Sequence, residues 1–532
     1  MTVDEVDAVV VGAGHHGLVT AAVLADAGWS VLVLEERDRV GGAVSSRESD
    51  GWIEDEFSAC HPLALASPVL RELDLGSHGL AWSHAQRPLA HVSRPGGSGV
   101  ALHTVAEDTA AALDREHPGD GAAWLDMVAH WDRVRDPLLS ALLTRWPPVK
   151  DTARLVARLG LRGAPDLARL ALLPVAQLGW ETFGGQGGRD LLAGNAMHAD
   201  IPPTSAGSGL YGWLMSMLAQ DVGFPSPRGG TSQLAEALRR RAESTGARVE
   251  TGVSVHRIQV RGRRVSSVQT QDGRTIRVRR AVVADTSAQQ LYTRLLDSDA
   301  VPGGLRRRLR RFTWDLPTVK LNFRLAGPAP WTAPAAHGAA VVHAGQDLAG
   351  ITRWAADLES ERVPERPFAL VGQMSTIDAG RSPAGTEALW LYTHLPRGMH
   401  DDARAVRETI DGSERLLESL APGFAALVTD RWVQTPRDLQ ASDANLGQGA
   451  VGGGTQQLFQ QALWRPVTGL GGPRTHVEGL YLGSAAVHPG GGVHGGCGYL
   501  AARAALQDSR WWGTPRSRMS LAVLHRLYDD GP

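Results

Sequence analysis

Three glycines near the N-terminus have the types and the spacing that bind a dinucleotide. The apolar run Ala8–Val11 ends in Gly12-Ala13-Gly14-His15-His16-Gly17, and a helical pattern follows. In such a turn Gly12 permits the tight bend, Gly14 lets the backbone approach a pyrophosphate, and Gly17 lets the helix pack against the strand. The start of that helix would present free N–H groups and the positive end of its dipole to the phosphates.

The next segment continues this pattern. A second apolar run, Val31–Leu34, is predicted as a strand and ends in Glu35, where a carboxylate can accept hydrogen bonds from ribose hydroxyls and would repel the 2′-phosphate of NADP. The pair Gly41-Gly42 would bend the chain back against the same dinucleotide, and an ordinary surface turn is the alternative. A glycine turn in an unrelated α/β protein is disfavoured, because strand, turn, helix, strand and acid occur in order.

A second glycine-rich loop lies near the C-terminus. Gly479–Gly483 is predicted as a strand, which leads through Ser484 into His488-Pro489-Gly490-Gly491-Gly492-Val493 and a helix at Tyr499–Leu506. The start of that helix can face an anion or the electron-rich edge of a ring. The two ends of the chain therefore both carry a strand, a glycine loop and a helix.

Composition limits the class of protein. The chain has 532 residues and a formal net charge of -2, so it is long enough for several subdomains and has no global field that favours nucleic acid. The only cysteines are Cys60 and Cys497, which excludes a disulfide framework, suits a reducing cytoplasm and leads us to expect no metal site. The only lysines are Lys150 and Lys320, which we interpret as GC-rich, actinobacterial coding bias. Met1–Glu5 shows no signal sequence, so we expect a cytoplasmic protein.

These elements predict an α/β fold with a Rossmann-type domain, a parallel sheet plus a β-meander, and a discontinuous α+β substrate domain. After the helix Ser232–Glu243, the meander would run through Arg248–Thr251, Val253–Val260 and Arg264–Gln269 to a hairpin at Asp272-Gly273, before a separate strand Ala281–Ala284. We expect nucleotide-binding segments at 1–75, 221–295 and 471–515, a helical substrate or cap region at 76–220, a substrate-domain sheet with helices at 296–470, and a C-terminal tail at 516–532.

The remaining apolar patterns predict the substrate domain. Leu138–Leu143 and Ala153–Leu173 have helical spacing, and Pro165 should divide the second run. Their interleaved arginines favour core-facing helices with a solvated basic face over the alternative, an amphipathic surface that contacts a membrane peripherally. Four further strands are expected: Thr318–Leu325, Phe368–Val371, Leu389–His394 and Leu427–Val433.

Together these motifs resemble the FAD-dependent phytoene desaturase-like oxidoreductases, a bacterial NAD(P)/FAD-dependent oxidoreductase branch of the amine-oxidase-like flavoproteins. The resemblance is specific at Val9–Gly17 with Glu35, at Pro227–Thr231, at Gly447–Pro466 and at Gly479–Ala502. It implies one non-covalent FAD for each chain. The residues that it implies around FAD are Gly12, Gly14, His16, Gly17, Glu35, Glu36, Gly41, Gly42, Ala43, Val253, Gly483, Ser484, Gly491, Gly492 and Val493.

The resemblance also implies a reaction. We expect an oxidoreductase that removes a hydride from a C–H bond of a hydrophobic, aromatic or secondary-metabolite substrate, with dioxygen or a quinone as the final acceptor. An amine oxidase is a close variant that would need an aromatic cage. A redox-neutral isomerase or cyclase, and an FAD-bearing interaction protein without turnover, are the alternatives.

Four polar or thiol side chains were considered for a role in catalysis, substrate binding or cofactor attachment. His494 is the candidate catalytic polar group near the flavin ring, and a histidine held by its own loop is the alternative. Arg228 would orient an anionic substrate group or, as we favour, stabilise its own loop. Covalent attachment of flavin to Cys497 is disfavoured, and Cys60 next to His61 is no nucleophile–base pair because adjacency in sequence lacks that geometry.

Overall fold

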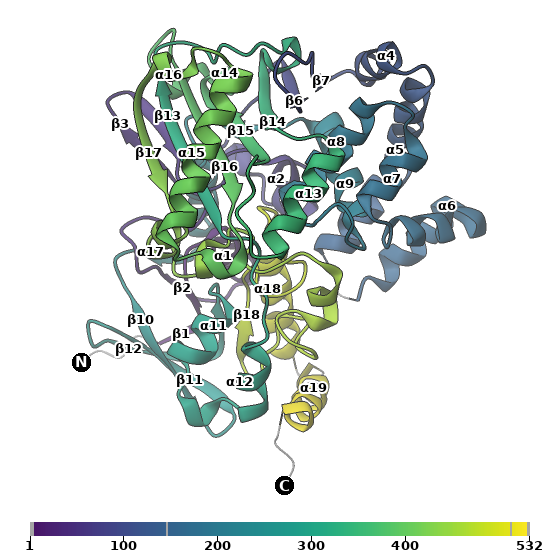
Figure 1. The fold of residues 1–532 in the computed structure, drawn as a ribbon. Coiled ribbons are helices and arrows are strands. Elements are labelled where there is room, and N and C mark those ends of the chain that lie inside the picture. Colours follow the sequence, from purple (N-terminus) through teal and green to yellow (C-terminus); the bar gives the residue numbers. More distant parts are fainter. Residues whose placement is uncertain (1–4, 145–146, 511–512, 529–532) are drawn as a thin grey trace.

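The computed structural model describes residues 5–144, 147–510 and 513–528. Within these residues the chain forms two seven-stranded sheets and a separate group of helices (Figure 1). In Figure 1 the first sheet lies at the bottom, the second at the upper left, and helices α4–α9 at the right. The predicted α/β class, with a parallel sheet that carries a β-meander beside a second α+β part, is confirmed.

The first sheet joins strands that are far apart in sequence. Its order is β10-β11-β12-β1-β2-β9, and β18 pairs with β12. β1 lies parallel to β2 and β12, and β12 lies parallel to β18. The carboxyl ends of these strands therefore meet at one edge, where open α/β sheets bind ligands. The bounds are β1 (Glu5–Val11), β2 (Val31–Leu34), β9 (Arg248–Glu250), β10 (Val255–Arg261), β11 (Arg264–Thr270), β12 (Thr275–Ala284) and β18 (Leu480–Leu482).

Strand β12 corrects one prediction. The separate strand expected at Ala281–Ala284 is the second half of a continuous strand that begins at Thr275. Its first half pairs antiparallel with β11 and alternates between buried and exposed residues, whereas its second half pairs in parallel with β1 and β18 and is buried. The pattern changes from alternating to continuously apolar where the strand becomes covered on both faces in the parallel sheet. This change does not mark the end of a strand.

Three helices pack on one face of this sheet: α1 (His15–Asp26), α10 (Ser232–Glu243) and α18 (Gly496–Asp508). The contact between α1 and α18 is a backbone contact. A Cβ atom on Gly498 would lie 1.9 Å from the carbonyl oxygen of His16, and the Thr20 hydroxyl donates a 3.0 Å hydrogen bond to the Gly498 carbonyl. Only glycine at position 498 permits this approach, which brings the first and last glycine turns together.

The second sheet has the order β17-β13-β16-β15-β14-β6-β7. All its pairs are antiparallel except β14 with β6. Four of its strands lie within a few residues of the predicted ones, but β6, β7 and β14 were not predicted. The bounds are β6 (Arg87–Val92), β7 (Val100–Leu102), β13 (Thr318–Leu325), β14 (Ala339–Ala344), β15 (Ala369–Gln373), β16 (Glu387–His394) and β17 (Val428–Gln434).

The helical group contains one further correction. Helix α6 is interrupted at Gly160, which has a left-handed φ of 69°, and continues through Pro165, where the break was predicted. Glycine tolerates this conformation, and it accounts for the kink. In Figure 1, α6 projects from the body of the molecule. The helices are α4 (Ala106–Glu116), α5 (Asp120–Leu143), α6 (Val149–Leu170), α7 (Val175–Thr182), α8 (Gln186–Ala196) and α9 (Ser208–Val222).

The remaining elements are short or lie outside the two sheets. Over the described residues, no helix is both long enough and apolar enough to cross a membrane. The short strands are β3 (Ser46–Ser49), β4 (Trp52–Asp55), β5 (Trp82–Ser83) and β8 (Ser226–Pro227). The helices are α2 (Pro62–Ala66), α3 (Pro68–Glu72), α11 (Ala288–Gln290), α12 (Gly303–Leu309), α13 (Leu348–Glu359), α14 (Met374–Ile377), α15 (Ala403–Leu420), α16 (Phe424–Leu427), α17 (Pro436–Ser442) and α19 (Gly513–Tyr528).

Candidate active site

A cavity of about 870 Å³ lies where the three parts of the molecule meet. The glycine turns of the first sheet line one side, and residues of β13 and β16 in the second sheet line another. Helix α9 contributes Tyr211, Leu214 and Met215. The cavity therefore combines the carboxyl edge of the parallel sheet with walls from the second sheet and from α9.

The first glycine turn enters this cavity without side chains in the way. Gly12 has a φ of 97°, and Gly14 begins α1 with no side-chain cap and no acidic residue in the first turn. A Cβ atom on Gly14 would lie 2.5 Å from Oδ2 of Asp285, and one on Gly17 would lie 2.2 Å from the Gly12 carbonyl. The turn leaves backbone N–H groups and a positive helix end available to an anion.

Glu35 ends β2 beside this turn. Its two carboxylate oxygens accept hydrogen bonds from the backbone N–H groups of Ala13, at 2.7 Å, and Arg37, at 3.0 Å. Burial raises the pKa of Glu35. The Gly41 N–H donates to the Ala13 carbonyl at 2.8 Å, so the second glycine pair does return to the first turn. Glu35 is thus held in place beside both glycine turns, where it can accept from hydroxyl groups.

The C-terminal loop closes the same side of the cavity. Gly491, Gly492 and Val493 line it, and the imidazole of His15 lies 3.3 Å from the Gly492 carbonyl. Ser484 also lines the cavity, but its hydroxyl donates a 2.6 Å hydrogen bond to the Thr286 carbonyl. Arg465 holds the neighbouring segments together. Its side chain is fully buried and donates hydrogen bonds to the backbone carbonyls of residues 453, 454, 455 and 485.

The wall from the second sheet is aromatic and carries a buried amine. Trp390 and Tyr392 have their rings stacked at 5.8 Å, and both line the cavity. Lys320 lines it too and is 4% exposed; its Nζ donates to the carbonyls of Asp55, at 2.5 Å, and Phe57, at 3.3 Å. Burial lowers the pKa of Lys320 to about 8 although nearby acids oppose the shift. A lysine with such a pKa can exchange a proton near neutral pH.

Comparison with known proteins identifies the family. A model of the flavin containing amine oxidoreductases matches residues 17–506. The chain belongs to this family. Rat "Pyridine nucleotide-disulfide oxidoreductase domain-containing protein 2" is 28% identical to it over 95% of this chain and 94% of the relative. The zeta-carotene-forming phytoene desaturase of Myxococcus xanthus is 26% identical over 91% and 90%. The structure of cyclohexylamine oxidase from Brevibacterium oxydans aligns with a TM-score of 0.57 at 18% identity, over 94% of this chain and 99% of that one.

The flavin oxidoreductase therefore uses FAD, and the turns fit this cofactor. The side-chain-free surfaces of Gly12, Gly14 and Gly42 suit the approach of a pyrophosphate, and a Cβ on Gly42 would already lie 3.4 Å from Cα of Gly14. Glu35 suits the ribose. The start of α18, which has no side-chain cap, adds a second positive helix end from the C-terminus of the chain.

Most residues expected around FAD line the cavity. They are Gly12, Gly14, His16, Glu35, Glu36, Gly41, Gly42, Ala43, Ser484, Gly491, Gly492 and Val493. Three expected residues lie behind this surface. Gly17 packs against Gly12 and donates its N–H to Asp285, Val253 donates its N–H to the Glu35 carbonyl, and a Cβ on Gly483 would lie 2.9 Å from Val283. These three support the cavity wall, and Ser254 and Val255 line the cavity next to Val253.

The structure places His494 and Arg228 outside the cavity lining. His494 is 1% exposed and absent from the cavity lining; its Nδ1 accepts from the Gly496 N–H at 2.9 Å and its Nε2 lies 3.2 Å from the Gly490 carbonyl. This geometry matches the alternative of a histidine held by its own loop. Arg228 is exposed and also absent from the lining. The ring of His61 lies 2.6 Å from the Thr231 hydroxyl, so its partner is not Cys60.

Two residues of the site were overlooked in the sequence. Lys320 was visible as one of only two lysines, placed in a predicted strand, but its rarity was attributed to coding bias. Asp285 follows β12 as Glu35 follows β2, and it also lines the cavity. The signal that identified Glu35, an acid directly after a buried parallel strand, would also have identified Asp285.

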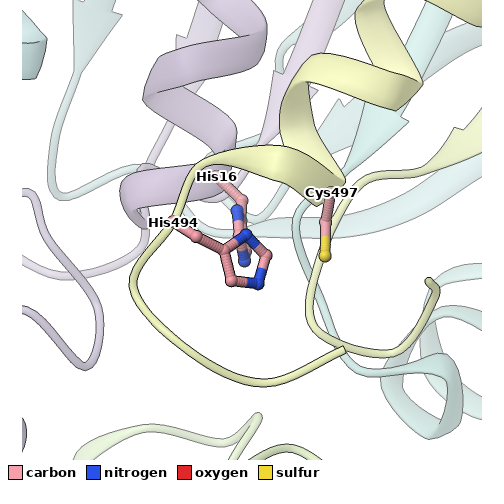
Figure 2. A group of neighbouring side chains, drawn as sticks. All are labelled: His16, His494 and Cys497. Carbon is pink, nitrogen blue, oxygen red and sulfur yellow. The ribbon is translucent and has the colours of Figure 1, made fainter. Parts of the chain in front are cut away.

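The glycine loops also enclose a cluster of His16, His494 and Cys497 (Figure 2). His16 lies at the start of α1, Cys497 at the start of α18 and His494 in the loop before α18. These residues are 2%, 0% and 1% exposed, respectively. Burial lowers the pKa of His494 to about 3 and raises that of the Cys497 thiol to about 12. At neutral pH the cluster is thus uncharged.

We predict that Asp285 makes stability depend on pH. Burial, together with Asp443 and Glu35, raises its pKa from 3.8 to about 8, so between these values the folded chain holds a proton that the unfolded chain has lost. Stability from this group is complete below about pH 4 and falls as pH rises to 8. Asp285→Asn should remove this slope, a difference of at most about 4 kcal/mol between pH 5 and 8, in urea unfolding of the flavin-free protein.

The matched control for this experiment is Asp50→Asn, an aspartate whose side chain is 87% exposed. It should keep the pH dependence of the unmodified protein. Equal slopes in Asp285→Asn and the unmodified protein would contradict the assignment of a proton to Asp285.

Proposed function

We propose that this FAD-dependent oxidoreductase removes a hydride from a C–H bond of a hydrophobic or aromatic small molecule and leaves a C=C or C=N bond. FAD, when bound non-covalently, supplies the acceptor for the hydride. Dioxygen or a quinone then takes the electrons, since the sequence has no second dinucleotide fingerprint for a separate NAD(P)H site. The observation that carries the proposal is the buried Lys320 amine of the second sheet, which lines the same cavity as the dinucleotide turns.

The walls of the cavity support a hydrophobic substrate. Apolar side chains from several elements line it: Leu63, Leu214, Met215, Phe224, Val341, Trp390 and Val451. Such surfaces bind a substrate by removing apolar area from water, and a few polar groups orient it. The name of the Myxococcus relative, a phytoene desaturase, agrees with a hydrocarbon substrate.

Lys320 is suited to receive the proton that accompanies this oxidation. A neutral amine has two N–H groups, which match the two carbonyl acceptors of Asp55 and Phe57. Its lone pair is then left to accept a proton from the substrate at Nζ. Because the pKa is about 8, the neutral amine is present in useful amounts at neutral to mildly alkaline pH.

An amine substrate is the second candidate. Two buried acids, Asp200 and Asp315, line the cavity with Tyr392, and aromatic faces with carboxylates attract an ammonium group. His394 lies 2.8 Å from Asp200, and Asp315 accepts from the N–H groups of Gly452 and Gly454, so both carboxylates already have partners. Trp390 and Tyr392 lie side by side on one strand and form one wall; an aromatic cage needs facing rings.

Lys320→Met should slow substrate oxidation about 10²-fold or more while FAD remains bound, because the proton acceptor is lost. The rate of flavin bleaching would be measured without oxygen, with terpenoid hydrocarbons of increasing length and with primary amines such as cyclohexylamine. With the unmodified enzyme the rate should rise with pH through about 8, following Lys320, and the variant should lack this rise.

Lys150→Met is the control, because Lys150 is the other lysine and is exposed on α6. Unchanged rates and pH profile in Lys320→Met would contradict the role of the amine. Bleaching by amines alone would favour the second candidate. Conversion of a substrate by pre-reduced enzyme without net bleaching would instead show a redox-neutral isomerase or cyclase.

We also propose a peripheral membrane contact next to the cavity. Leu172, Phe459, Leu463 and Trp464 are more than half exposed. The segments that carry them meet at Gly207, whose N–H donates to the Leu172 carbonyl and whose Cβ position lies 2.9 Å from Leu458. Helix α9, which lines the cavity, begins at the next residue. An apolar surface there would pass a lipophilic substrate from the bilayer to the cavity.

This contact predicts that the protein floats with phosphatidylcholine–phosphatidylglycerol vesicles in a density gradient. The triple change Phe459→Ser, Leu463→Ser and Trp464→Ser should abolish flotation, because it removes the apolar side chains. The control is Val105→Ser with Leu125→Ser, two exposed apolar residues, of which Val105 directly precedes α4 and Leu125 lies in α5. Unmodified protein that stays at the bottom of the gradient would contradict the proposal.

A further inference from the structure

We propose that His16, His494 and Cys497 bind one transition-metal ion, Zn²⁺ or Cu⁺, which links the first and last glycine turns. One ligand atom from each side chain lies within 4.8 Å of the other two, and all three residues are buried (Figure 2). This proposal departs from the expectation of no metal. It is independent of the substrate and of the reaction.

The strongest observation is the unpartnered imidazole of His16. Neither of its ring nitrogens has a hydrogen bond of normal geometry, although the side chain is 2% exposed; its contact with the Gly495 backbone falls short of one. Leaving a buried polar group unsatisfied costs about 1–3 kcal/mol. A metal ion would use the free lone pair and remove that cost.

One ring nitrogen of His494, Nε2, has the carbonyl partner that metal-binding histidines commonly have. Its Nε2 faces the Gly490 carbonyl at 3.2 Å, while Nδ1 accepts the Gly496 N–H at 2.9 Å. In a metal site the nitrogen that is not a ligand donates to a carbonyl or carboxylate. Nδ1 would therefore bind the ion in place of the Gly496 N–H, and Nε2–H would keep its carbonyl partner.

Cys497 supplies the third ligand. Its sulfur lies 3.5 Å from the Gly490 carbonyl and 3.6 Å from the Val487 carbonyl. Binding would replace the thiol proton, which is released, so affinity should increase with pH. Two imidazoles and a thiolate select Zn²⁺ or Cu⁺ over Mg²⁺ and Ca²⁺, which prefer oxygen. Ligands on one zinc lie about 3.5 Å apart, so small side-chain rotations would close the site.

The metal content of the purified, flavin-loaded protein tests this proposal. After dialysis against ZnCl₂, or against Cu⁺ under reducing conditions, elemental analysis should find about one ion for each chain. X-ray absorption at the metal edge should show one sulfur ligand at about 2.3 Å together with imidazole nitrogens. Zn²⁺ should also raise the melting temperature, because the ion binds only the folded arrangement.

Cys497→Ser and His16→Asn should each lower metal retention at least tenfold and abolish the Zn²⁺-dependent rise in melting temperature. Cys60→Ser is the matched control, since it removes the chain's other cysteine, which lies outside the cluster, and it should retain the metal. Unmodified protein without bound metal or sulfur ligation would overturn the proposal. Equal metal retention by Cys497→Ser and Cys60→Ser would also overturn it. Neither the metal content of the unmodified protein nor this comparison depends on the stability of a variant.

Discussion

The site depends on a contact between two backbones. Gly498 in the last helix meets the carbonyl of His16 in the first turn so closely that a Cβ would lie 1.9 Å from that oxygen. The Thr20 hydroxyl bridges the same two segments by hydrogen bonds to the carbonyls of His16 and Gly498. Because these segments come from opposite ends of the chain, their contact brings the start of α1 and the start of α18 together. Residues of the second sheet, on β13 and β16, line the same cavity.

The parts of this arrangement that could be predicted from sequence are those with a local cause. Gly12 and Gly14 are recognisable because an apolar strand precedes them and a helix follows, and Glu35 because it ends the next strand. The C-terminal loop around Gly492 has the same local order. Strand β13 was predicted at its observed bounds since its alternation of apolar with polar residues can be read without its neighbours.

The parts that were missed have causes far away in the chain. Strand β6 contains Pro88 and pairs in parallel with β14, a strand more than two hundred residues later, so neither shows its partner locally. The lowered pKa of Lys320 results from burial against Asp55 and Phe57, which lie far away in the sequence, and cannot be read from one strand. His16, His494 and Cys497 become neighbours only because the two turns meet. The hydrogen bond that His494 accepts from the Gly496 N–H within its own loop could not be read from the sequence either.

The absorption spectrum of the purified protein, taken before and after acid precipitation, tests the central claim most directly. The joined glycine turns predict flavin bands near roughly 370 and 450 nm with about one FAD for each chain, all of it released into the supernatant. Yellow colour that stays in the pellet would contradict non-covalent binding. A colourless protein that does not take up added FAD would contradict the claim that these two turns form a flavin site.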